Sequence, residues 1–99
     1  MSPQQRIVIR ASDPGDTVEL VRLAALDSAT AIDGPSLVGE IDGSIVAAVS
    51  LDGGRPIANP FVESAHVVEM LESHLRALRA AAVVRHSERG RGRLIPVPA

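Results

Sequence analysis

Apolar positions concentrate in two short runs on either side of Asp42-Gly43, between Leu37 and Leu51. Asp-Gly between two such runs predicts a hairpin, because a type I′ turn needs positive φ at both central residues. A two-residue loop also sets the expected register. The predicted pairs, counted from the turn, are Ile41 with Ser44, Gly39 with Val46, and Leu37 with Ala48.

In that register, both faces of the hairpin are apolar. One face carries Leu37, Ile41, Val46 and Ala48. The other carries Val38, Ile45, Ala47, Val49 and Leu51. Aliphatic side chains on both faces predict that the second strand is central and covered on both sides.

Two elements precede the hairpin. Residues 6–10 form a short apolar run typical of a strand. A helix is expected over 15–27, with Asp13 as its cap and Pro14 at the first helical position, where the missing N–H costs nothing. Asp16 adds first-turn negative charge. The expected apolar face of this helix carries Val18, Leu20, Val21, Ala24 and Ala25.

Two further elements follow the hairpin. Residues 55–59 predict a short strand, which Pro56 confines to a sheet edge. Ser64 is a suitable N-cap for a helix from about 65 to 82. The apolar stripe of that helix is Val68, Leu71, Leu75, Leu78 and Ala82. Residues 85–99 lack a period and contain two prolines, which predicts a flexible, Arg-rich tail.

These elements predict an α+β fold with the order β-α-β-β-β-α. The strands form one antiparallel sheet, with one helix on each face. Residues 1–84 are expected to form a single domain, and residues 85–99 the tail.

Composition removes several classes of chemistry. The 99 residues contain no Cys, Trp or Tyr and a single Phe. A disulfide framework, a zinc ribbon, a thiol nucleophile and phenol chemistry are therefore excluded, and a base-stacking surface is disfavoured. The sequence has no run of membrane-spanning length and no signal-peptide pattern at its N-terminus. We therefore expect a cytoplasmic protein with no membrane partner.

Charge is distributed unevenly along the chain. Residues 1–75 hold four Arg and eleven acidic residues, a net charge of −7. Residues 76–99 hold six Arg and one Glu, a net charge of +5. The basic segment could bind nucleic acid or another polyanion. The acidic body and the lack of interleaved aromatic residues argue against a nucleic-acid partner. They favour a tail that aids solubility or pairs with the protein's own acidic body.

The order of elements resembles the front half of the GNAT family of N-acetyltransferases. The residues that carry the resemblance are Ile9–Asp16, similar to the opening strand and first helix, and Val38–Ala48, similar to the central hairpin. The resemblance covers roughly residues 6–52. It implies a GNAT-like half fold and, in the family, a glycine-rich loop before a helix that holds the pyrophosphate of acetyl-coenzyme A.

The corresponding connection here departs from that loop. Asn59–Ser64 contains no glycine, Pro60 has no N–H, and Glu63 would repel an anion. The frequent tyrosine general acid of the family also has no counterpart. We therefore assign no catalytic and no cofactor-binding residues, and expect a non-catalytic GNAT-like interaction domain. The truncated edge of a half-length sheet predicts self-association as a homodimer, and the apolar stripe of the second helix could also serve a partner helix.

Two alternative functions remain. An acyl-coenzyme A-dependent N-acetyltransferase could have its site completed by a second chain, and acetyl-coenzyme A would then be its cofactor. A polyanion binder could act through the Arg-rich tail. Within that tail, Arg89–Leu94 is a near-match to the pyrophosphate loop of the GNAT family, with Leu94 where the loop requires Gly or Ala, and a solvated basic tail is the favoured interpretation. We favour the interaction domain over both.

Acidic and histidine residues on the second helix raise the question of a metal. They are Glu63, His66, Glu69, Glu72 and His74. Only Glu63 and His66 have a ligand-like spacing, and they straddle the start of the helix. A polar helix face is the favoured interpretation, so no metal ligand is assigned. Asp13 and Asp16 are likewise interpreted as helix-start residues and not as a catalytic pair.

Overall fold

The structure is a computed structural model that describes the backbone of residues 5–94 and the side chains of residues 5–83. It confirms the predicted α+β order. The elements are β1 (Ile7–Ala11), a 3-10 turn (Pro14–Asp16), α1 (Thr17–Leu26), β2 (Ser36–Ile41), β3 (Ser44–Ser50), β4 (Ile57–Ala58) and α2 (Ala65–Leu94).

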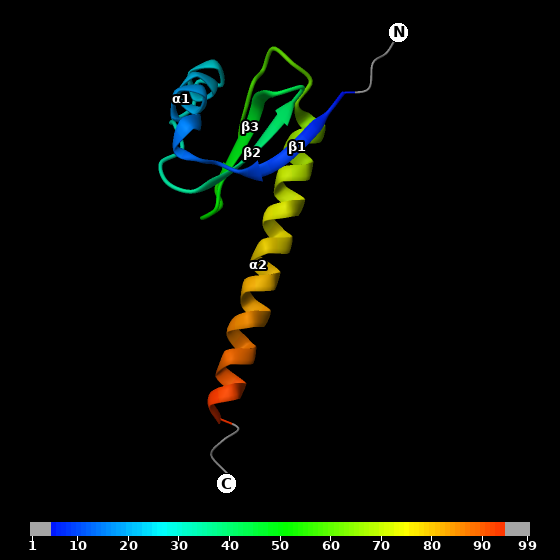
Figure 1. The fold of residues 1–99 in the computed structure, drawn as a ribbon. Helices are drawn as coiled ribbons and strands as arrows, with labels where there is room; N and C mark the ends of the chain where they lie inside the picture. The colour runs from blue at the N-terminus through cyan, green and yellow to red at the C-terminus, as the bar shows by residue number, and fades with distance from the viewer. Residues whose placement is uncertain (1–4, 95–99) are drawn as a thin grey trace.

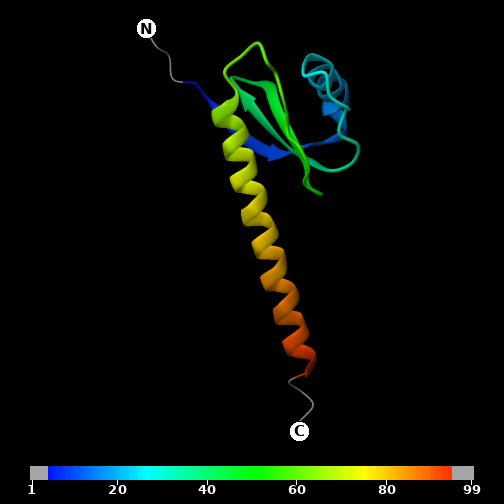
Figure 2. The ribbon, with the colours of Figure 1, turned by 180° about the vertical axis from the view of Figure 1, so that it is seen from behind.

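The four strands form one antiparallel sheet in the order β1-β2-β3-β4. Helix α1 packs on one face and α2 on the other, as the two views of the ribbon show (Figures 1 and 2). The prediction of one helix on each face is therefore confirmed. The predicted edge strand is also present, although β4 is only two residues long.

The central hairpin turns at Asp42 and Gly43, as predicted. Their φ angles are 52° and 89°, so both lie in the left-handed region that a type I′ turn requires. Ile41 pairs with Ser44 as expected. Beyond Glu40 the predicted register is wrong, because one extra residue in β3 forms a β-bulge. The observed pairs beyond the bulge are Gly39 with Ala47, Val38 with Ala48, and Leu37 with Val49.

The bulge redistributes the side chains of β3 between the two faces. Val46 and the following Ala47 both lie on the α2 side, whereas Ala48 lies on the α1 side. The expected grouping of the faces was therefore wrong, although the expectation that both faces are covered is confirmed. The α1-side core is Leu20, Leu23, Ala24, Val38, Ile45, Ala48 and Ile57. The α2-side core is Leu37, Val46, Ala47, Val49, Val67, Leu71 and Leu75.

The start of α1 follows the predicted capping pattern. Asp13 Oδ1 accepts the N–H of Gly15 at 2.8 Å, and Asp16 Oδ2 accepts the N–H of Asp13 at 2.8 Å. This reciprocal pair is a capping box. Pro14 occupies the first position of the 3-10 turn that leads into α1.

The apolar face predicted for α1 is wrong in part. Val18 and Val21 are 72% and 53% exposed, and Ala25 is exposed as well, whereas Leu23 is buried with Leu20 and Ala24. The helix is therefore rotated about its axis relative to the prediction, and two of its carboxylates accept hydrogen bonds from the sheet. Glu19 Oε2 accepts the N–H of Ile45 at 3.2 Å, and Asp27 Oδ2 accepts the N–H of Ala58 at 3.1 Å.

Helix α2 approaches the sheet closely at Gly39. A Cβ at this position would overlap Val67 Cγ1 and lie 3.3 Å from Ile9 Cδ1. The absence of a side chain at Gly39 therefore allows the first turn of α2 to pack against β2.

Helix α2 continues to Leu94, so the predicted irregular tail is wrong for residues 85–94. Arg, Glu and Leu favour a helix over these residues, and the next proline along the chain is Pro96. Residues 95–99 lie outside the described residues. Figures 1 and 2 show the second half of α2 leaving the sheet. The Cα radius of gyration is accordingly 17.4 Å, against about 13 Å for a compact chain of this length.

The predicted stripe of α2 is buried only where the helix crosses the sheet. Leu71 and Leu75 are buried together with Val67, and Val68 is partly buried. Leu78 is 42% exposed and Ala82 is exposed, because both lie where the helix departs from the sheet. The last hydrogen bond from α2 to the sheet region among the described side chains joins Arg79 Nη2 to the carbonyl of Leu51 at 3.3 Å.

Candidate functional site

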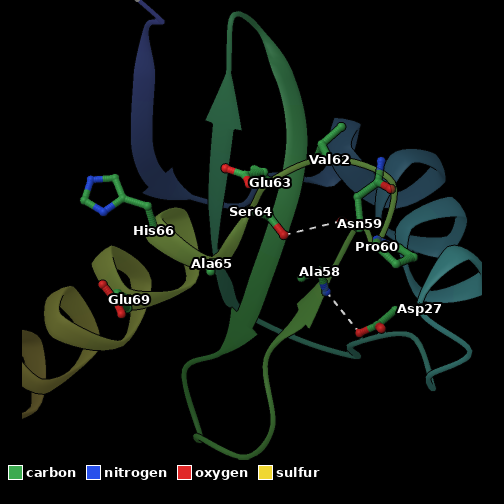
Figure 3. A pocket seen from close by; sticks show the side chains of 10 residues that line it. All are labelled: Asp27, Ala58, Asn59, Pro60, Val62, Glu63, Ser64, Ala65, His66 and Glu69. Carbon is green, nitrogen blue, oxygen red and sulfur yellow. Dashed lines mark hydrogen bonds between the residues drawn. The ribbon is translucent and has the colours of Figure 1, made fainter.

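The connection between β4 and α2 borders a pocket of about 600 Å³ (Figure 3). It lies at the start of a helix, where unpaired N–H groups favour an anion. The lining residues are Asp27, Ala58, Asn59, Pro60, Val62, Glu63, Ser64, Ala65, His66 and Glu69.

Local hydrogen bonds shape this connection. Asn59 Oδ1 accepts the N–H of Phe61 at 2.8 Å, which closes an Asx turn. Ser64 Oγ donates to the carbonyl of Asn59 at 3.3 Å (Figure 3). The Ser64 carbonyl accepts the N–H of Val68 at 2.9 Å, so Ser64 stands at the predicted N-cap position. Its hydroxyl ties the helix start to the end of β4.

The electrostatics of the pocket oppose an anionic ligand. Three carboxylates line it, from Asp27, Glu63 and Glu69, and the only cationic candidate in the lining is His66. Pro60 has no N–H, and none of the lining residues is a glycine. A diphosphate would therefore face acidic side chains and few convergent donors.

The five candidate metal residues do not form one cluster. Glu63, His66 and Glu69 line this pocket, His74 lies with His66 and Glu69 in a groove beside β1, and Glu72 lies near Arg76 and Arg79. Within residues 5–83, no three His, Asp or Glu side chains converge in a way that could hold a metal ion. Over the same part of the chain, no helix has the length and apolarity needed to cross a membrane.

The two edges of the sheet differ in their protection. At the β4 edge, residues 57 and 59 face β3, so the N–H of Ala58 points outward. Asp27 Oδ2 accepts this N–H at 3.1 Å (Figure 3). Pro56 and Pro60 flank the strand and offer no further donors. The β4 edge is therefore closed to another strand.

The β1 edge is open along the described chain. Asp42 N–H donates to the Arg6 carbonyl, and Ser12 N–H donates to the Ser36 carbonyl, each at 2.8 Å. Even-numbered residues of this segment therefore bond to β2, and the backbone groups of Ile7, Ile9 and Ala11 point outward. Among the described residues, the one bond made to these outward groups is from Arg10 Nη1 to the Ala11 carbonyl, at 3.1 Å.

A groove with both apolar and polar lining residues runs beside this open edge. Ile7 and Ile9 are half-buried and pack on the α2-side core. The groove has a volume of about 410 Å³, and the α2 side chains along it are mostly small or polar. Its lining residues are Ile9, His66, Glu69, Met70, Ser73, His74 and Ala77.

Arg10 links β1 to the 3-10 turn and to β2 on the α1 side of the sheet. Its guanidinium makes two hydrogen bonds to Asp16, at 2.8 and 3.0 Å, and one to Glu40 Oε2 at 2.8 Å. The bonds from Arg10, followed by the N–H of Asp13, lower the pKa of Asp16 from 3.8 to about 2. The same two carboxylates raise the pKa of Arg10 above its ordinary value. The capping box confirms the prediction that Asp16 is a helix-start residue. The ion-pair cluster around Arg10 was not predicted from the sequence.

No protein-family profile, curated protein or solved structure matches this chain significantly.

Proposed function

We propose that this chain is a non-catalytic, acetyltransferase-like interaction domain that self-associates as a homodimer. The observation that carries the proposal is the contrast between the two sheet edges. The β4 edge is closed by Asp27 and two prolines, whereas β1 presents outward backbone groups at Ile7, Ile9 and Ala11.

An open edge favours pairing with another strand. Folded proteins usually protect their edges with prolines, bulges, inward charges or very short strands, because unpaired N–H and C=O groups are templates for association. Strand β1 has five residues and a continuous register with β2, and it contains no proline. Addition of a strand at such an edge is a common mode of protein recognition.

The proposed domain is non-catalytic. In the GNAT resemblance, the pyrophosphate loop would fall at the connection between β4 and α2. That connection instead borders the carboxylates of Asp27, Glu63 and Glu69. The proposed binding surface is the β1 edge, and the proposal requires no catalysis at this pocket.

Light scattering over a concentration series tests the proposal on the full chain. The monomer has a mass of 10.4 kDa. We expect the weight-average mass to rise toward twice that value between about 5 and 500 µM, as mass action requires for a reversible dimer. A mass of 10.4 kDa throughout the series would contradict self-association.

A further inference from the structure

We infer that the strand added at the β1 edge is β1 of a second copy, antiparallel and related by a two-fold axis through Ile9. This inference rests on the proposed self-association and specifies its geometry. It predicts one continuous sheet across the dimer, with both α2 helices on the same face.

The backbone groups fit this arrangement. Ile7, Ile9 and Ala11 are the β1 residues whose N–H and C=O groups point away from β2. With the axis at Ile9, each Ile9 pairs with Ile9 of the partner subunit, and Ile7 pairs with Ala11 of the partner subunit. Every outward residue of β1 is then placed in a hydrogen-bonded pair.

The charges on β1 select this register over its neighbours. An axis at Val8 would place Arg6 opposite Arg10 of the partner subunit, and an axis at Arg10 would place that residue opposite itself. Like charges directly opposite destabilise a strand pair. An axis at Ile9 instead places Arg10 opposite Val8 and Arg6 opposite Ser12.

The apolar side chains also match. Because an axis perpendicular to the sheet preserves its faces, Ile7 and Ile9 of both subunits would lie on the α2 side. The partner's isoleucines would then lie at the mouth of the groove beside Met70 and Ser73. An axis at Ile7 would leave Ala11 unpaired and place Ile9 opposite Gln5. The self-complementary pattern of β1 thus favours a second copy over an unrelated strand.

Single cysteines test the register, because the chain has no native Cys. In the proposed dimer the two copies of residue 9 face each other at a Cα separation of about 5.5 Å, within disulfide range. Two copies of residue 7 would be offset by roughly 13 Å along the strands. We expect Ile9→Cys to form a disulfide-linked dimer under mild oxidation, at least about tenfold faster than Ile7→Cys or Ala11→Cys alone. A mixture of Ile7→Cys and Ala11→Cys should cross-link as a heterodimer.

The outcomes separate the two proposals. If the mass series shows a dimer but Ile9→Cys does not cross-link, or Ile7→Cys links to itself, the register is wrong and self-association stands. If the protein is monomeric, both proposals are overturned.

Amide exchange on the unmodified chain provides a second test that needs no variant. The amides of Ile7, Ile9 and Ala11 should exchange at least about tenfold more slowly at high concentration, and unchanged rates would overturn the inference.

Discussion

Asp27 Oδ2 accepts the N–H of Ala58 at 3.1 Å and thereby joins the C-terminal end of α1 to the outer side of β4. A carboxylate at a helix C-terminus is unfavourable to the helix dipole. The hydrogen bond to Ala58 offsets that cost and gives the outward amide of the edge strand a partner within the chain. The same edge is unsuited to a further strand, in contrast to β1.

Replacing Asp27 with Ala should destabilise the fold and open the β4 edge. The amide of Ala58 would lose a charge-assisted hydrogen bond, and we expect a loss of about 1–2 kcal/mol in the free energy of unfolding. Urea denaturation measures this change. Asp33→Ala, at an exposed position, is the matched control and should stay within about 0.5 kcal/mol of the parent. Equal stabilities for the two variants would show that the edge bond contributes nothing.

The cluster of Arg10, Asp16 and Glu40 should make stability depend on acid pH. The pKa of Asp16 is lowered from 3.8 to about 2 in the folded protein, chiefly by its hydrogen bonds to Arg10. A lowered folded-state pKa contributes stability above the unfolded-state value, and this contribution is lost as the pH falls from about 4 through 2. The shift corresponds to about 2 kcal/mol at neutral pH.

Asp16→Asn tests this linkage. We expect it to lower the free energy of unfolding at pH 7 by about 2 kcal/mol and to flatten the dependence between pH 4 and 2. Asp33→Asn serves as the exposed control. Urea titrations at several pH values give both quantities. A variant that keeps the acid dependence of the parent would contradict the assignment to Asp16.

Gly39→Ala should destabilise the contact between α2 and the sheet. The new methyl group would overlap Val67 Cγ1 and approach Ile9 Cδ1, and overpacking of this kind costs about 1–3 kcal/mol. Val67→Ala removes the overlapping carbon, so the double variant should lose less stability than the sum of the two single variants. A double-mutant cycle by urea denaturation measures the coupling. Additive losses would mean that Val67 does not limit the space at Gly39.

Acetyl-coenzyme A should not bind tightly at the start of α2. The pyrophosphate would meet the carboxylates of Glu63 and Glu69, and Pro60 supplies no N–H. Each missing charge-assisted bond removes about 1.5–3 kcal/mol, so two losses would weaken a micromolar site to roughly millimolar. Calorimetry should therefore show no saturable binding below about 1 mM. A micromolar Kd that is lost on changing Ser64 would instead identify an acyl-coenzyme A site.

Local sequence signals predicted the parts of the fold that depend on local chemistry. Asp42-Gly43 specified the turn, and Asp13, Pro14 and Asp16 specified the start of the first helix. The bulge in β3 could not be predicted in this way. Residues 45–49 are all apolar, so their pattern is the same with or without an extra residue.

Interactions between segments that are distant in the sequence account for the other features that were not predicted correctly. Helix α1 carries apolar residues around most of its surface. Its orientation agrees with the hydrogen bonds that Glu19 and Asp27 accept from N–H groups of strands that come later in the sequence. The Arg10 cluster likewise requires the β1–β2 register, which places Glu40 beside Arg10. The difference in protection between the two sheet edges depends on the strand order, which places β1 and β4 on the outside of the sheet.

Two substitutions at residue 9 test the central claim, association through β1, most directly. Ile9→Pro removes one outward N–H while sparing the bonds to β2. Ile9→Val is the matched control, because Val keeps that N–H and has the same number of side-chain carbons as Pro. By symmetry the dimer would lose two hydrogen bonds of about 1 kcal/mol each, so we expect its Kd to rise at least about 30-fold. Sedimentation velocity should give a mass near 10.4 kDa for Ile9→Pro and twice that for Ile9→Val. A folded Ile9→Pro variant that dimerises as tightly as Ile9→Val would contradict the claim.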